Sequence, residues 1–309
     1  MFFKTDIAKA YDTVSWTYLM KILTACNFGD RWKGWIMTCL KSGYSSVLVN
    51  GSPTDEFAME RGLRQGDPLA PFLFTLIMEG LHLILTKAIQ NGVFKGVSIG
   101  EQEYPLTHLF FTDDAIFVGE WSSSNILNLT CLLRCFHYVS GLKVNLEKSA
   151  LYGLGVESNA VKAVADRIGC KSENFPATFL GIPVGRNMSK IGNWKPLIEK
   201  FNKKLSKWKG RTLSFGGRLT LVNNILGSLG TYWFSLFLAP KGVIKRLEAI
   251  RRDFFWRTTA DNKAIPWVRW RETQKSKEDG ELGINSLSDL NIALIAKWFW
   301  RFKVEREAI

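Results

Sequence analysis

Apolar positions divide the chain into short runs and longer periodic stretches. Residues 2–7, 105–111 and 115–118 are short and mostly apolar, which is typical of strands. Asn50-Gly51 between two further short runs predicts a hairpin over 45–60. Apolar residues that recur every three or four positions predict helices. These helices cover residues 15–26, 31–41, 71–92, 123–139, 161–168, 194–208, 219–229, 243–255 and 287–302.

Polar residues predict where several of these helices begin and end. Ser15 and Asp30 are suitable N-caps for the first two helices, because their side-chain oxygens can accept hydrogen bonds from free backbone N–H groups. Gly141 follows the helix over 123–139 and predicts its end. Loops rich in Gly, Pro and charge are predicted near 184–192, 209–217 and 258–283.

Two adjacent acids lie between the apolar runs 105–111 and 115–118. Phe111-Thr112-Asp113-Asp114 is typical of a hairpin that carries both carboxylates at its tip. Paired carboxylates in an apolar setting repel each other unless a cation neutralises them, so the pair indicates a divalent metal site. An Asp-Asp pair alone is weak evidence, since most such pairs are ordinary turn residues.

A third acid strengthens the metal interpretation. Asp6 lies in an apolar strand and could meet Asp113 and Asp114 on a neighbouring strand. Three carboxylates held together suit Mg²⁺. Two such ions about 3.5–4 Å apart can activate a hydroxyl and stabilise a leaving pyrophosphate. Asp12 is better explained as part of the turn before the first helix.

Five motifs in order carry a family resemblance. They are Asp6, then Arg61-Gly62-Leu63-Arg64-Gln65-Gly66-Asp67-Pro68-Leu69-Ala70-Pro71, then Phe111 to Asp114, then Gly141-Leu142-Lys143-Val144-Asn145, then Phe179-Leu180-Gly181-Ile182-Pro183. Together they resemble the palm of a reverse transcriptase, most closely that of plant non-LTR (long interspersed element) retrotransposons. The resemblance covers about residues 2–185, and the basic region to about 305 resembles the segment after the palm in those elements.

The resemblance implies a fold and a division into domains. It implies an α+β right-hand polymerase palm over 1–185, in which an antiparallel sheet packs on helices. A helical, basic, thumb-like region would follow over 186–309. Met1 lies five residues before Asp6, so we expect the fingers subdomain to be missing from this chain, and a separate polypeptide could supply it.

The resemblance also implies roles for individual residues. Asp6, Asp113 and Asp114 would hold two Mg²⁺ or Mn²⁺ ions, and Lys148 would protonate the departing pyrophosphate. Tyr11 would select deoxynucleotides by steric exclusion. Arg64, Gln65 and Gly66 would border the incoming nucleotide and the template base. Phe179, Leu180 and Gly181 would hold the primer end. Taken singly, Tyr11 could equally be a core aromatic, and Lys148 a surface lysine.

One position departs from the family pattern, because Thr112 stands where an alanine usually precedes the paired acids.

Two functions remain open. One is an RNA-directed DNA polymerase that uses an RNA template, a DNA primer and deoxynucleoside triphosphates. The alternative is a non-catalytic nucleic-acid-binding remnant that is inactive because the fingers are absent.

Positive charge is confined to the second half of the chain. Residues 186–309 contain 25 Lys and Arg against 11 Asp and Glu, whereas residues 1–185 have a net charge of −1. The second half also holds 8 of the 12 tryptophans. Interleaved cations and aromatics suit a nucleic-acid track, for which Lys203, Lys204 and Lys207 are candidates. Solvated lysines over an aromatic core are the alternative, and we expect both descriptions to hold.

Other features narrow the class of protein. No segment qualifies as a membrane span, since the apolar stretch over 71–89 is interrupted by Glu79, His82 and Lys87. No secretory signal pattern is present, and the five cysteines suit reduced core thiols, so an intracellular protein, nuclear or cytoplasmic, is expected. The three histidines are too scattered in sequence to predict a ligand set.

Overall fold

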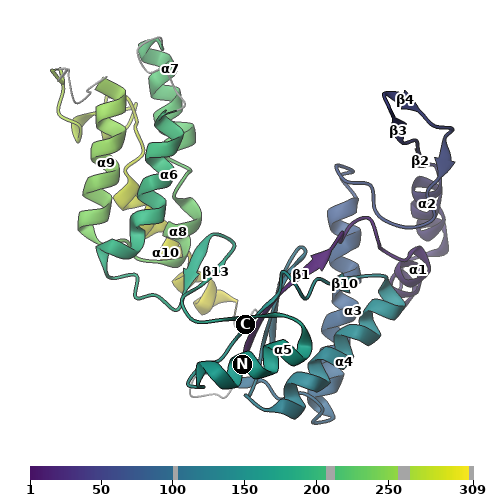
Figure 1. The fold of residues 1–309 in the computed structure, drawn as a ribbon. Helices are drawn as coiled ribbons and strands as arrows, with labels where there is room; N and C mark the ends of the chain where they lie inside the picture. Colours follow the sequence, from purple (N-terminus) through teal and green to yellow (C-terminus); the bar gives the residue numbers. More distant parts are fainter. Residues whose placement is uncertain (100–103, 207–212, 257–264, 306–309) are drawn as a thin grey trace. The chain divides into compact units, whose positions relative to one another are not determined.

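The computed structural model describes residues 1–99, 104–206, 213–256 and 265–305. The chain forms two compact units, Met1–Phe175 and Pro176–Ile309, called here the first and the second unit (Figure 1). The boundary expected from the sequence was at 185. The structure assigns residues 176–185 to the second unit instead.

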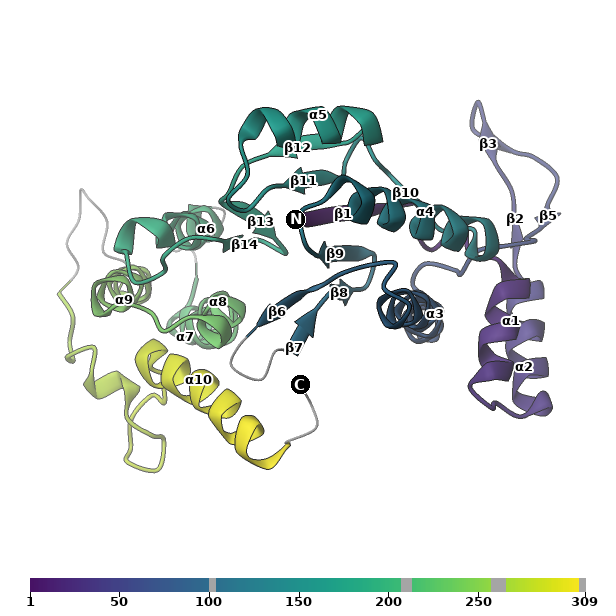
Figure 2. The ribbon, with the colours of Figure 1, turned by 90° about the horizontal axis from the view of Figure 1, so that it is seen from below.

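A mostly antiparallel sheet forms the centre of the first unit. Its strand order is β12-β11-β1-β9-β8, and β10 also pairs with β1 (Figure 2). The strands are β1 (Phe2–Ala8), β8 (His108–Phe111), β9 (Asp114–Val118), β10 (Lys143–Val144), β11 (Ala150–Tyr152) and β12 (Lys171–Glu173). The predicted strands over 2–7 and 115–118 are confirmed. The predicted strand over 105–111 is split, because β7 (Tyr104–Leu106) pairs separately with β6 (Val97–Ile99).

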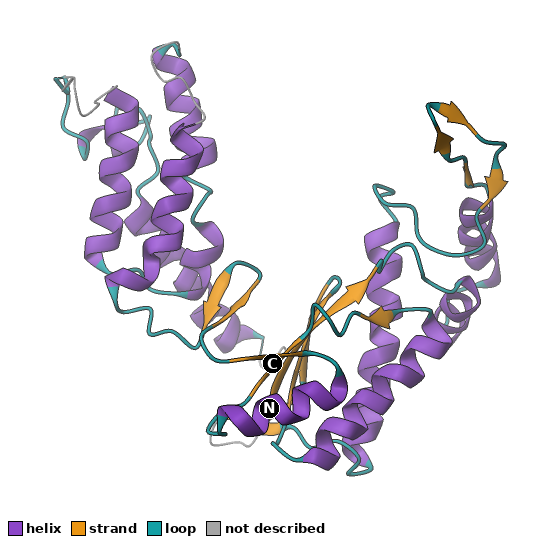
Figure 3. Cartoon of the chain, in the orientation of Figure 1, coloured by secondary structure: helices purple, strands orange, loops and turns teal. Residues whose placement is uncertain are grey.

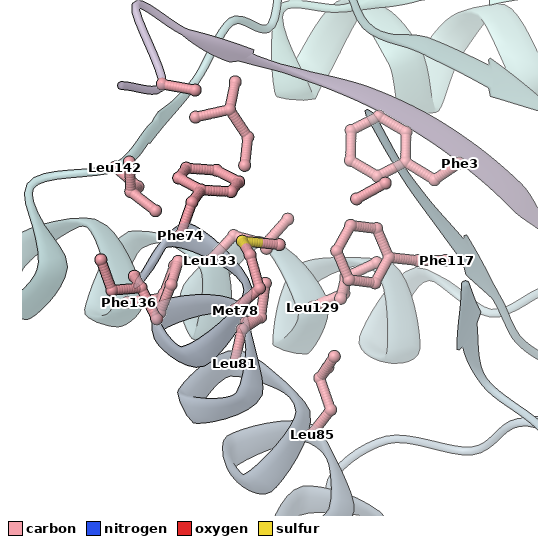
Figure 4. Close-up of a cluster of buried hydrophobic side chains, with 14 of the residues drawn as sticks. Phe3, Phe74, Met78, Leu81, Leu85, Phe117, Leu129, Leu133, Phe136 and Leu142 are labelled. Carbon is pink, nitrogen blue, oxygen red and sulfur yellow. The ribbon is translucent and has the colours of Figure 1, made fainter. Parts of the chain in front are cut away.

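Helices cover one face of this sheet. They include α3 (Ala70–Gln90), α4 (Ser123–Ser140) and α5 (Ser158–Ile168), while α1 (Trp16–Ala25) packs on α3 and α4. Alternate residues of β1 face this layer, so that Phe3 joins a core with Phe74, Phe117 and Leu133 (Figure 4). Because side chains alternate between the two faces of a strand, the other residues of β1 lie on the face that these helices do not cover.

The helix α3 is the central core helix of the first unit. It is long and apolar enough, by length and composition alone, to cross a membrane, contrary to the expectation from the sequence. In the structure, nine of its residues are buried, including Phe74, Ile77 and Leu85. The apolar side chains of α3 therefore form part of the core of the first unit.

The predicted helix ends are largely correct. The Ser15 hydroxyl accepts a hydrogen bond from the Tyr18 backbone N–H, and Gly141 ends α4 with a left-handed φ of 81°. The helix α2 (Asp30–Lys41) differs, because Gly29 is its N-cap and Asp30 is its first residue. The predicted hairpin over 45–60 is confirmed as a ribbon with Asn50 and Gly51 at the tip. Its strands are β2 (Tyr44–Ser45), β3 (Leu48–Val49), β4 (Ser52–Pro53) and β5 (Phe57–Ala58).

The second unit is mainly helical (Figure 3). A hairpin of β13 (Ala177–Phe179) and β14 (Ile182–Val184) precedes α6 (Lys195–Ser206), α7 (Phe215–Thr220), α8 (Thr231–Leu236), α9 (Lys241–Trp256) and α10 (Leu287–Val304). The 3₁₀ helices η1 (Ile191–Trp194) and η3 (Glu272–Gln274) and the π-helix η2 (Leu221–Leu226), which continues directly from α7, complete it. Its separate core surrounds the fully buried Trp194. The helix α8 was not predicted.

The expectation for the cysteines was wrong. Only Cys170 is buried, whereas Cys26, Cys39, Cys131 and Cys135 are exposed, so four of the five cysteines are not core thiols. Two of the histidines, although far apart in sequence, meet in the structure: His82 on α3 and His108 on β8 are hydrogen-bonded through Nδ1 and Nε2 at 2.8 Å.

Candidate active site

The central strands bring two carboxylates together. β1 and β9 are antiparallel neighbours, and their register places Asp6 opposite Asp114. Opposed residues on neighbouring strands have Cβ atoms about 4.5–5.5 Å apart. Thr5, one residue away, is buried on the other face and donates its hydroxyl to the Ala115 carbonyl. Both acids therefore lie on the face that α3 and α4 do not cover.

A tight turn carries the third acid. Phe111 pairs with Asp114, which leaves Thr112 and Asp113 as a two-residue loop between β8 and β9. Thr112 has a φ of 52°, a conformation that is unfavourable for a β-branched residue. Its hydroxyl donates to Asp113 Oδ1 at 2.9 Å. The predicted hairpin thus carries Asp113 at its tip, next to Asp114.

The three acids affect one another electrostatically. The pKa of Asp114 is raised above its usual value, first by burial and then by the charges of Asp113 and Asp6. Lys4 opposes this shift, because its positive charge lowers the pKa of Asp114. A bound divalent cation would act in the same direction as Lys4, and more strongly. The charge distribution therefore favours binding of a cation at this end of the sheet.

The acids fit a metal site by their chemistry and only partly by their present geometry. Carboxylate oxygens are the ligands that Mg²⁺ prefers. Within residues 1–99, 104–206, 213–256 and 265–305, however, no three His, Cys, Asp or Glu side chains converge as a ready metal site. Asp6 and Asp114 are opposed, while Asp113 accepts a hydrogen bond from Thr112.

A lysine lies beside the acids. Lys148 Nζ is 3.9 Å from Asp6 Oδ2, and its side chain is 69% exposed. The turn after β10 positions it, since the Lys148 backbone N–H donates to Asn145 Oδ1 and the Asn145 N–H donates to the Asp6 carbonyl. Lys148 is thus an exposed cation at the rim of the site, consistent in position with the proton donor expected from the sequence.

The loop over residues 61–66 packs closely on the turn that follows β1. The Gly62 N–H donates to the Val14 carbonyl, and Trp16 Nε1 donates to the Gly62 carbonyl at 2.7 Å. A Cβ on Gly62 would lie 2.7 Å from the Asp12 carbonyl oxygen, and its φ is 89°. Both the space and the backbone conformation therefore require glycine at this position.

This packing brings several predicted binding residues together. The half-buried Tyr11 stacks on Phe74 with ring centroids 4.9 Å apart, and Gln65 Nε2 donates to Asp12 Oδ1 at 3.4 Å. Arg64 and Gly66 are exposed in the same loop. A cavity of about 740 Å³ lies alongside and is lined by residues that include Asp12, Arg64 and Gln65. Asp12 belongs to the turn, as expected, yet its carboxylate orients Gln65.

The remaining predicted contacts belong to the second unit. Leu180 and Gly181 have φ values of 50° and 76° and form the two-residue turn between β13 and β14, beside Phe179. Lys203 and Lys204 are exposed on α6. Lys207 lies outside the described residues.

Comparison with known proteins decides the family. The family model described as "Reverse transcriptase (RNA-dependent DNA polymerase)" matches residues 1–184, more than half of the chain. The chain belongs to the reverse transcriptase family. Its mixed helices and sheets are those of a reverse transcriptase fold.

Two relatives of this chain are proteins of mobile elements. The uncharacterized 149 kDa protein of transposon TX1 from Xenopus laevis is 28% identical over 82% of this chain and 19% of its own length. The Pol polyprotein of a type-1 retrotransposable element R2 from Popillia japonica is 29% identical over 47% of this chain and 23% of its own length. The chain thus spans about a fifth of these relatives. A telomerase structure from Candida albicans aligns with 84% of this chain and 46% of its own, at a TM-score of 0.40 and 14% identity.

One residue of the candidate site was not predicted. Lys4 precedes Asp6 by two residues on β1 and pairs with Ile116 and Ala150 on the neighbouring strands. The period of two puts its side chain on the same face as Asp6 and Asp114. The sequence contained this signal, because the alternation along residues 2–7 already groups Lys4 with Asp6.

Proposed function

We propose that this chain is the catalytic region of a non-LTR retrotransposon reverse transcriptase, of the kind found in plants. Its reaction would be RNA-directed DNA synthesis by nucleotidyl transfer with two divalent cations, Mg²⁺ or Mn²⁺. The observation that carries the proposal is the register of β1 and β9, which opposes Asp6 to Asp114 beside Asp113. The family and the mobile-element relatives support it.

The residues of the site would divide the work. Asp6, Asp113 and Asp114 would hold the cations, and bound cations of this kind would supply activation of the primer hydroxyl and stabilisation of the departing pyrophosphate. Asp113 would have to turn away from Thr112 to join the other two acids. Lys148, beside Asp6, would deliver a proton to the leaving group. Tyr11 is restrained against Phe74 and would limit the space at the sugar 2′ position.

The binding of substrates would use both units. Arg64, Gln65 and Gly66 would border the nucleotide and the template base, with Gln65 oriented by Asp12. Phe179, Leu180 and Gly181, at the turn of the β13–β14 hairpin, would hold the primer end. The net charge of +14 over residues 186–309 favours a polyanionic partner, here an RNA template with a DNA primer. With these substrates, the proposed reaction would take place inside the cell, in the nucleus or the cytoplasm.

A second candidate function is nucleic-acid binding without synthesis. It is favoured by the arrangement of the acids, since no three of the described ligand-type side chains converge on a metal position. In this case the chain would need a partner polypeptide for synthesis. We infer that the isolated chain binds Mg²⁺ and primer–template, and extends the primer poorly.

Primer extension separates the two functions. The chain is supplied with an RNA template, a DNA primer, deoxynucleoside triphosphates and Mg²⁺, and Asp113→Asn serves as the matched control. Extension that Asp113→Asn reduces by about 10²- to 10³-fold, as expected when one group that supports the transition-state charge is lost, supports the polymerase. Binding of primer–template without any Asp113-dependent product supports the second candidate.

A further inference from the structure

A half-buried lysine lies on the acid-bearing face of the central strand. Lys4 is on β1, where its neighbours Phe3 and Thr5 are buried on the opposite face. Its register partners Ile116 and Ala150 show that it lies in the middle of the sheet. Removing an ammonium group from water is costly without an anion nearby. A lysine at this position therefore needs a compensating negative charge.

The acids supply that charge in the free protein. The positive charge of Lys4 is felt at Asp114, which lies opposite Asp6. This compensation weakens whenever another cation neutralises the same carboxylates. The face would then carry more positive charge than negative charge, unless the substrate brings a new anion.

The spacing along β1 identifies which anion is suitable. Two residues along an antiparallel strand advance about 6.8 Å. This step is comparable with the separation of neighbouring phosphates along a nucleic-acid strand. Asp6 would lie at the primer hydroxyl, so a phosphate one linkage back from the primer end would lie near Lys4.

We propose that Lys4 binds the backbone phosphate of the last linkage of the primer strand. This inference rests on the proposed function and adds a substrate contact to it. Lys4 positions the primer end relative to Asp6, and its cationic charge is what the contact requires. Lys4 on β1 pairs with Ala150 on β11, and Ala150 in turn pairs with Lys171 on β12. Only the small side chain of Ala150 therefore stands between the two lysines in this line across the sheet.

Binding of a primer–template tests the contact without any synthesis. The full chain is titrated with an RNA–DNA primer–template at several salt concentrations, in the absence of nucleoside triphosphates. One lost phosphate contact should lower the slope of log K against log salt by about 0.9. We expect this decrease and a roughly three- to tenfold weaker binding for Lys4→Gln. Lys4→Arg, which keeps the charge, should bind like the parent chain.

A primer with one neutral methylphosphonate linkage locates the phosphate. At the last linkage, this substitution should abolish the difference between the parent chain and Lys4→Gln. Placed several linkages upstream, it should leave the difference unchanged. Lys21→Gln, which removes an exposed lysine on α1, is the matched control and should retain the parent slope.

The outcomes distinguish this inference from the proposed function. If the parent chain binds no primer–template, the proposed function fails and the Lys4 contact fails with it. If the parent binds and Lys4→Gln keeps the full slope, only the Lys4 contact is wrong. A Lys4→Arg variant as weak as Lys4→Gln, with unchanged melting temperature, would also overturn the contact, because it would show that charge is not what matters.

Discussion

The first unit carries 16 basic and 17 acidic residues, whereas the second carries 25 basic and 11 acidic residues. In the first unit the candidate site depends on one pair of strands, because Asp6 lies opposite Asp114 only in one register of β1 and β9. A slip of one residue would move Asp6 to the other face of the sheet. For the nucleic-acid binding proposed for the second unit, an excess of positive charge is enough, and no single strand register is required. The precisely positioned acids thus lie in the first unit, and the excess of positive charge lies in the second.

Separate cores allow this separation. The first core surrounds α3 and the second surrounds Trp194, and the described residues of the two clusters do not overlap. We therefore expect the two cores to respond separately to mutation. Truncation of a core side chain in either unit tests this independence most directly. Removal of lysines tests the difference in charge, and the pH dependence of stability tests a property that only the first unit should show.

The largest effect is expected from Trp194→Ala. The Trp194 side chain is fully buried, donates from Nε1 to the Met188 carbonyl at 2.7 Å, and packs against Trp233. Truncating a buried tryptophan costs about 3–5 kcal/mol. We expect the melting temperature of the second unit to fall by roughly 10–20 °C, measured by calorimetry, while the transition of the first unit is unchanged.

Phe74→Ala provides the mirror variant, since Phe74 is 1% exposed in the core of the first unit. It should lower the transition of the first unit and leave that of the second unchanged. A single transition that both variants shift equally would show that the two units unfold together, and the comparison would lose its basis.

The sequence predicts the strands β1 and β9 and the acids, because a clear alternation and an Asp-Asp turn are local signals. The helix α8 escapes prediction, since its six residues are too few to show a helical period. The cysteines of α4 were misassigned because Leu129 and Leu133 define its buried stripe. Cys131 lies two residues from each, which is about 200° around a helix.

The site shows the same limit. The meeting of Asp6 with the paired acids was predicted from the strand pattern and the family resemblance. Lys4 was not predicted, although strand alternation groups it with Asp6. The contact between His82 and His108 joins a helix to an edge strand, and the orientation of Gln65 by Asp12 joins two loops. No local period encodes such tertiary contacts.

A smaller effect is expected when positive charge is removed from α6 and the residue that follows it. Lys203, Lys204 and Lys207 are replaced by Ala together, and affinity for primer–template is measured against salt. Losing two to three phosphate contacts should reduce the slope by about 2–3. Affinity near 0.15 M salt should fall roughly 10- to 100-fold, equivalent to about 1.4–2.7 kcal/mol.

Three lysines of the first unit form the matched control for this triple variant. Lys21, Lys87 and Lys162 lie on α1, α3 and α5, and replacing them removes the same net charge. They should cost less than about threefold in affinity, because the first unit has no net positive surplus. Equal losses in the two triple variants would mean that overall charge, and not a track on the second unit, attracts the nucleic acid.

The smallest effect concerns acid stability, and it should appear only in the first unit, which contains all three histidines. Burial, and then the charge of His82, lower the pKa of His108 from 6.5 to about 4. Between these values the unfolded chain binds a proton that the folded chain does not, so stability falls as the pH is lowered from about 6.5 to about 4. Allowing for solvent screening, we expect a loss of about 1–2 kcal/mol.

Two variants with opposite signs make this last measurement decisive. His108→Gln should flatten the pH dependence of the first unit, followed by its melting temperature between about pH 7 and pH 4. Asp114→Asn should steepen it, because the pKa of Asp114 is raised, and its protonation in the folded state partly offsets the loss at His108. The second unit has no histidine and should show neither change. If His108→Gln keeps the parent's pH dependence, the imidazole pair is not the source of the acid sensitivity, and the two units do not differ in this respect.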